Sequence, residues 1–94
     1  MDFIAENIRI AVRQEHYVFG AHADQRMRER KVLAWQVIEG LEHATLLAES
    51  PDGIPNPTAE FQQLLPDGTS LKAVWAWISE AGIAKLVTVH FFDR

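Results

Sequence analysis

The chain has 94 residues with a formal net charge of −4; 48% of them are hydrophobic and 23% are charged. This length predicts a single domain over residues 1–94, and the absence of cysteine excludes disulfides and cysteine-bound metals. The negative balance argues against a general affinity for nucleic acid, although one local basic run holds Arg26, Arg28, Arg30 and Lys31.

The N-terminal segment lacks the basic and apolar regions of a signal peptide. The most apolar stretch, residues 86–92, is far shorter than the ~20 residues that a membrane helix needs. We therefore expect a cytoplasmic protein that does not associate with a membrane.

Helical periodicity runs through the first half of the chain. A first helix, capped by Asp2, is predicted from apolar residues that recur on one face before Gly20, namely Ile4, Ile8, Ala11 and Val12. A second helix is predicted over residues 22–31. A third is predicted over residues 34–43, weakened slightly by Gly40, and its inward stripe is Ala34, Val37, Ile38 and Leu41.

From Thr45 onward the pattern changes to that of strands. The alternation predicts strands at residues 45–49, 60–65, 71–78 and 83–92, with a proline-containing loop and two turns between them. In the last strand, one face is expected to hold Val87, Val89 and Phe91, and the other Leu86, Thr88, His90 and Phe92. Helices followed by strands with short links predict an α+β fold, in which N-terminal helices cover one face of a four-stranded antiparallel sheet.

The second predicted helix carries the sequence His22-Ala23-Asp24-Gln25-Arg26-Met27-Arg28-Glu29-Arg30. Positions four apart share a helix face, so His22, Arg26 and Arg30 form a ridge with one imidazole and two permanent cations. Metal-independent RNA cleavage needs a base for the 2′-hydroxyl proton, an acid for the leaving 5′-oxygen and cations for the phosphate. Lys72 and His90, on adjoining strands, would complete this catalytic set if their side chains face the helix.

The chain resembles the DUF4258 family of small bacterial proteins over nearly its whole length. The likeness rests on the His22–Arg30 motif, on Val37-Ile38-Glu39-Gly40-Leu41 and on Val87-Thr88-Val89-His90. Two positions depart from the family's pattern, because members often carry His where this chain has Lys72 and Tyr where it has His90. The resemblance implies a RelE-like fold and a toxin-type ribonuclease acting on RNA or the ribosome and neutralised by an antitoxin, or a relative that has lost the activity.

The same residues also fit structural roles. His22 can cap its helix or bind a backbone carbonyl, and Arg26 and Arg30 can pair with acidic residues such as Glu29, Glu39 or Glu42. Trp75 and Trp77 can either fill a buried sheet face or stack on RNA bases. A non-catalytic interaction module is the competing function, with the apolar closing strand pairing edge to edge in a homodimer.

Other chemistries lack their usual signatures. The chain has no glycine-rich phosphate loop, no serine or cysteine nucleophile motif, no paired-carboxylate motif and no histidine pair with metal-ligand spacing. We therefore expect no cofactor and no metal site. Whether the protein is an enzyme is left open by the sequence.

Overall fold

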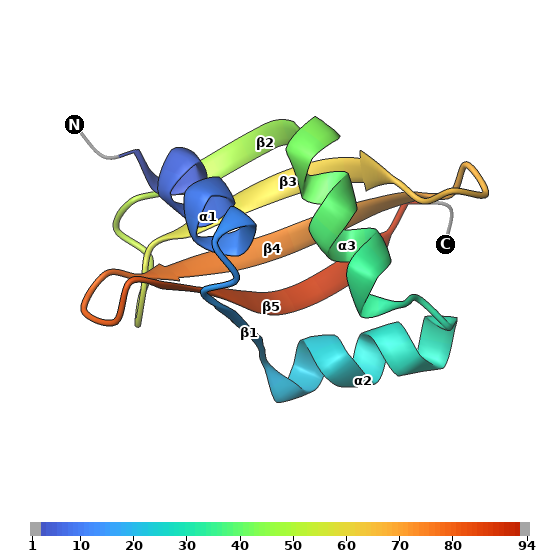
Figure 1. Ribbon diagram of the computed structural model, residues 1–94, viewed down its shortest axis with the longest axis horizontal. Helices are drawn as coiled ribbons and strands as arrows, with labels where there is room; N and C mark the ends of the chain where they lie inside the picture. The colour runs from blue at the N-terminus through green and yellow to red at the C-terminus, as the bar shows by residue number, and fades with distance from the viewer. Residues whose placement is uncertain (1–2, 93–94) are drawn as a thin grey trace.

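A computed structural model describes residues 3–92, which form helices packed on a five-stranded sheet. The elements are α1 (Ile4–Arg13), β1 (Tyr17–Phe19), α2 (Ala21–Arg30), α3 (Ala34–Gly40), the 3-10 helix η1 (Leu41–His43), β2 (Thr45–Ser50), β3 (Thr58–Leu64), β4 (Ser70–Ile78) and β5 (Ile83–Phe91). The strand order is β1-β5-β4-β3-β2. Helices α1 and α3 lie across one face of the sheet, and α2 lies along the β5 side (Figure 1). The α+β class is confirmed.

The expected four strands are present and pair antiparallel, but the first strand of the sheet was not expected. β1 pairs in parallel with β5, with Tyr17 opposite Ala84 and Phe19 opposite Leu86. The sheet is therefore mixed, because three extended residues between α1 and α2 are enough to form a ladder but too few to show an alternating pattern.

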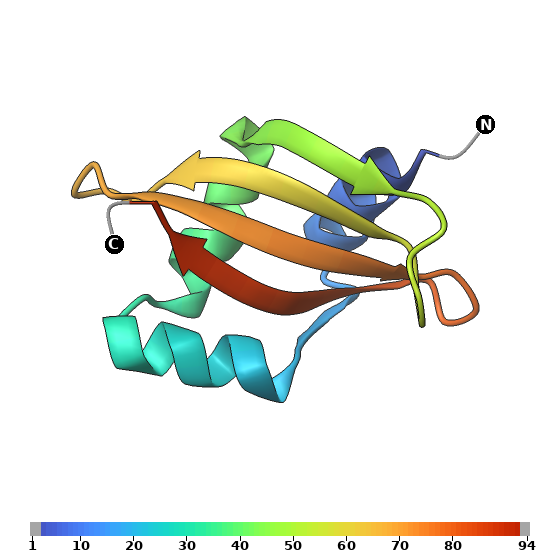
Figure 2. The same cartoon turned by 180° about the vertical axis from the view of Figure 1, so that it is seen from behind.

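Because of β1, the closing strand β5 is not the edge of the sheet. β5 has β4 on one side, and on the other side it has β1 followed by α2 (Figures 1 and 2). β1 covers only Ala84–Leu86 of the outer edge of β5, and α2 packs beside this strand, so the edge-to-edge homodimer expected of the closing strand stays a prediction. The two edge strands of the sheet in the described residues are β1 and β2.

The core lies between the sheet and the two helices α1 and α3. All four apolar residues expected on the inner face of α1 are buried, and so are Val37 of α3 and Leu41 of η1, whereas Ala34 is exposed. Trp75 is fully buried and Trp77 packs against the same core. The structural alternative for these tryptophans is therefore the one observed. Asp2, expected as the cap of α1, lies outside the described residues.

A β-bulge interrupts β5 and corrects the expected alternation of its side chains. Trp75 pairs with Leu86 and Val74 pairs with Thr88, so Val87 is an extra residue without a partner on β4. Before the bulge the buried residues are the even-numbered Ala84 and Leu86, and after it they are the odd-numbered Val89 and Phe91. A bulge moves all later side chains to the opposite face from the one that simple alternation gives. Leu86 is thus in the core and does not share a face with His90.

Gln63 of β3 fixes α3 against the sheet. Its side chain is 3% exposed, and its Nε2 donates hydrogen bonds to the carbonyl oxygens of Gln36 (3.4 Å) and Val37 (3.2 Å). A Cβ at Gly40 would collide with this Nε2. The glycine expected to weaken the third helix therefore provides the room for a buried amide, which satisfies carbonyl groups of α3.

Helices α1 and α2 end in the same way. A left-handed residue follows each helix. For α1 it is Glu15, two residues after the end of the helix, with a φ of 64°, and for α2 it is Lys31, directly after the helix, with a φ of 58°. The next N–H in each case bonds back to the last turn, from His16 to the Ala11 carbonyl (2.7 Å) and from Val32 to the Met27 carbonyl. This is the Schellman helix end, whose left-handed position is usually glycine.

Candidate functional site

Helix α2 starts directly beside β5. Gly20 precedes the helix, and its N–H donates a hydrogen bond to the Leu86 carbonyl (2.9 Å). A Cβ at Gly20 would come within 3.1 Å of that carbonyl oxygen, so the chain passes β5 closely before it turns into the helix. Ala23 and Met27 are buried and hold α2 against the sheet. This attachment determines where the candidate residues on α2 lie.

Lys72 and His90 are direct cross-strand partners on β4 and β5. They lie on the face of the sheet that carries neither α1 nor α3, opposite the buried residues Leu71 and Val89 (Figure 2). On the next strand, Glu60 of β3 pairs with Lys72 (Nζ to Oε1 3.3 Å). Three adjoining strands thus present a carboxylate, an ammonium group and an imidazole next to one another.

The charges around His90 come from both the sheet and α2. Partial burial lowers the pKa of the His90 imidazole, and the positive charges of Lys72, Arg26 and His22 lower this pKa further, while Glu60 opposes them. His22 and Arg26 are thus near enough to His90 for their charges to act on its imidazole. A lowered pKa keeps the imidazole neutral at pH 7, when it can accept a proton.

Arg30 lies apart from the other four candidate residues. Its guanidinium carbon is 4.7 Å from the centroid of the Phe91 ring. Phe91 is buried on the core side of β5, whereas its neighbour His90 faces the other way. The ridge His22–Arg26–Arg30 turns by about 80° over eight residues of an α-helix, which carries Arg30 away from the open face.

Arg26 and Arg28 have acidic neighbours on their own helix. Arg26 lies 3.5 Å from Glu29, and Arg28 lies 2.7 Å from Asp24. Such exposed helical pairs contribute little stability, ~0.3–0.5 kcal/mol each, so an incoming phosphate can displace them. His22 is exposed and makes no hydrogen bond to the residues that the structure describes, so neither structural role expected for it is observed.

No local sequence pattern marks Glu60 as part of the site. Its contact with Lys72 depends on the register of β3 against β4, in which Gln62 is directly across from Lys72 and Glu60 is diagonal to it. Within residues 3–92, no three His, Asp or Glu side chains gather closely enough to hold a metal ion. None of the helices in this part of the chain has the length and apolar character required to span a bilayer.

Comparison with known proteins identifies no relative. No protein-family model matches the sequence, and neither a curated protein nor a solved structure matches it. The resemblance to the DUF4258 family and the RelE-like packing therefore stay predictions, and the candidate function rests on the side chains of the open face.

Proposed function

We propose that this protein is a metal-independent, RelE-like ribonuclease of the toxin type, which binds the RNA backbone on the open face of the sheet beside α2. The observation that carries the proposal is the position of His90, an imidazole with a lowered pKa between Lys72 on the neighbouring strand and the charged side chains of α2. Neutral imidazole beside cations suits abstraction of a proton next to a phosphodiester.

Each residue has a distinct role in this reaction. His90 removes the proton of the 2′-hydroxyl, and the resulting oxygen attacks the adjacent phosphorus. Arg26 and Lys72 stabilise the charge that develops on the non-bridging oxygens. His22, in its protonated form, gives a proton to the leaving 5′-oxygen. The products are a 2′,3′-cyclic phosphate and a 5′-hydroxyl end, and Glu60 orients Lys72 through their ion pair.

The experiment is cleavage of end-labelled RNA by the purified protein in the presence of a chelator, with and without ribosomes. We expect products with cyclic phosphate ends, and loss of cleavage in His90→Ala and Lys72→Ala. The matched controls are His43→Ala on η1 and Lys85→Ala, an exposed lysine further along β5, and both should retain cleavage. Circular dichroism would verify that every variant is folded.

A non-catalytic interaction module is the second candidate, and the exposed edge strand β2 favours it. Every residue of β2 is exposed, including Leu46 and Leu47 at 43% each. An edge strand with apolar side chains and free backbone groups is a surface on which a second copy or a protein partner can add a strand. Light scattering would test it: a dimer that Leu47→Lys converts to a monomer, together with no RNA cleavage, would support this function over the nuclease.

A further inference from the structure

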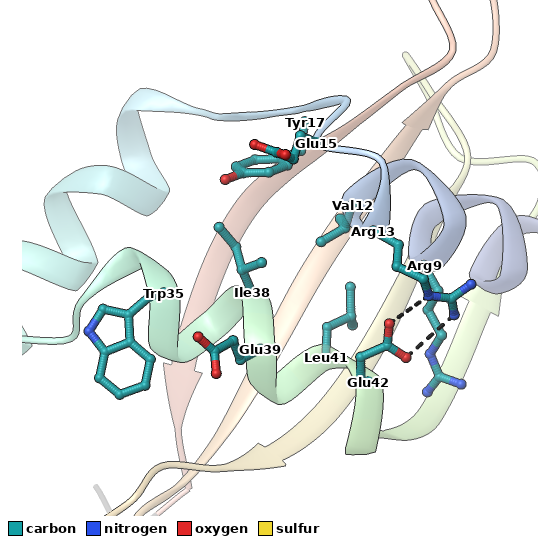
Figure 3. A pocket seen from close by; sticks show the side chains of 10 residues that line it. All are labelled: Arg9, Val12, Arg13, Glu15, Tyr17, Trp35, Ile38, Glu39, Leu41 and Glu42. Atoms are coloured by element: carbon teal, nitrogen blue, oxygen red, sulfur yellow. Dashed lines mark hydrogen bonds and ion pairs between the residues drawn. The ribbon is translucent and has the colours of Figure 1, made fainter.

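A cavity on the helix-covered side of the molecule is separate from the open face. It has a volume of about 360 Å³ and lies between the end of α1, β1 and α3 (Figure 3). Val12, Ile38 and Leu41 supply aliphatic lining, and Tyr17 and Trp35 supply aromatic rings. Cavities of this size and apolar character are typical of small-ligand sites.

Trp35 distinguishes this cavity from an ordinary surface depression. Its side chain lines the cavity and is 51% exposed, while Trp75 is fully buried and Trp77 packs on the core. An exposed indole beside an apolar cavity leaves a large ring face without a packing partner. A ligand with an apolar body would cover that face.

The charges are distributed unevenly along the cavity. At one end Arg13 forms an ion pair with Glu42 (Nε to Oε1 2.6 Å), and Arg9 donates to the Ala44 carbonyl (2.7 Å) (Figure 3). These arginines are therefore already engaged by protein groups.

The other end of the cavity is aromatic and acidic. Glu39 stands one helical turn after Trp35, and Glu15 stands two residues before Tyr17. Neither carboxylate is paired with a cation among residues 3–92. Glu15 has a left-handed backbone conformation, with a φ of 64°.

We propose that this cavity binds a small arylalkylamine. The aromatic ring packs on Trp35 and on the aliphatic lining, and the ammonium group pairs with the carboxylate of Glu39, one helical turn after Trp35. An ammonium group next to an indole face also gains from cation–π attraction. This site is independent of the nuclease proposal, since it uses α1, β1 and α3 and not the open face of the sheet.

The test is a titration of the full chain with three isosteric probes, followed by the Trp35 indole N–H signal in NMR spectra. The probes are phenethylamine, the neutral phenethyl alcohol and the anionic hydrocinnamate. We expect saturable shifts with phenethylamine, and binding about fivefold tighter than that of the alcohol, as for a partly exposed charge-assisted contact. Hydrocinnamate should bind more weakly than both.

Two variants test the Glu39 carboxylate and the Trp35 indole separately, and a third is a control. Glu39→Gln should remove the preference for the amine over the alcohol, and Trp35→Ala should weaken both probes. Glu29→Gln, on α2 and outside the cavity, is the matched control and should leave the titration unchanged. Equal affinity for amine and alcohol, tighter binding of hydrocinnamate, or no saturable shift at millimolar amine would overturn the proposal. RNA cleavage by Glu39→Gln is expected to match that of the unmodified protein, so the two proposals can fail separately.

Discussion

Lys72 and His90 stand directly opposite each other on β4 and β5, and the bulge at Val87 is what brings them to the same face. Without the extra residue, His90 would follow Leu86 in simple alternation and point into the core. With it, Val89 and Phe91 fill the core and His90 faces outward beside α2. Bulges that redirect a side chain are common next to active sites.

The bulge makes a clear prediction for two neighbouring residues. Leu86→Ala should lower the free energy of unfolding by about 2–4 kcal/mol, because it empties a fully buried position. Val87→Ala should cost less than about 1 kcal/mol, because Val87 is 36% exposed. Urea unfolding measures both values. The reverse order of destabilisation would mean that β5 alternates without interruption.

The His90 pKa gives a prediction for pH. Partial burial and then the charge of Lys72 lower this pKa in the folded state. At pH values just below the ordinary imidazole pKa of about 6.5, His90 is therefore more protonated in the unfolded chain than in the folded one. The contribution of His90 to the free energy of unfolding is therefore fully present above about pH 6.5 and is lost as the pH falls through the folded-state pKa.

An NMR titration of the His90 ring protons measures this pKa directly. We expect a midpoint below that of the ordinary imidazole, and Lys72→Gln should raise it because one of the cations near the ring is removed. Lys85→Gln, further along β5, serves as the control. A midpoint unaffected by Lys72→Gln would show that the two side chains do not interact.

Gly40→Ala tests the buried amide of Gln63. In an exposed helix this change usually stabilises by about 0.5–1 kcal/mol. Here we expect destabilisation by about 1–2 kcal/mol, because the new Cβ displaces the Gln63 Nε2 from the carbonyl oxygens that it satisfies. Thermal unfolding would measure the change. A gain in stability would show that Gln63 relaxes without cost.

The two left-handed helix ends form a matched pair. Glu15→Gly and Lys31→Gly should each raise the free energy of unfolding by about 0.5–1 kcal/mol, because glycine adopts a positive φ without strain. Neither change should remove the preference for phenethylamine over phenethyl alcohol, because the ammonium group pairs with Glu39. If both changes destabilise, these side chains make contacts that outweigh the backbone strain.

Much of the fold could be predicted from the sequence, because the spacing of apolar residues in a long segment indicates both its secondary structure and its buried face. The strong apolar face of α1 and the turn signal at residues 66–69 identify a helix and a hairpin without tertiary information. β1 and the Val87 bulge could not be predicted in this way. Three residues show no period, and a bulge is defined by the partner strand and not by its own residues.

The same distinction between local pattern and tertiary contact applies to the candidate site. The motif on α2 is local, so His22 and Arg26 could be found from helical spacing alone. The contact of Arg30 with Phe91 depends on how α2 lies against β5, and the ion pair of Glu60 depends on the register of β3. The charged end of the cavity joins α1 to η1, and no local pattern indicates that pairing.

The most direct test of the proposed function is the rate of RNA cleavage by the unmodified protein and by His90→Ala and His43→Ala, with a chelator present. We expect cyclic phosphate products from the unmodified protein and from His43→Ala, and a rate at least about a hundredfold lower for folded His90→Ala, which lacks the general base. Cleavage by His90→Ala at the unmodified rate would contradict the role of His90. No cleavage by any of the three proteins, with or without ribosomes, would contradict the nuclease function itself.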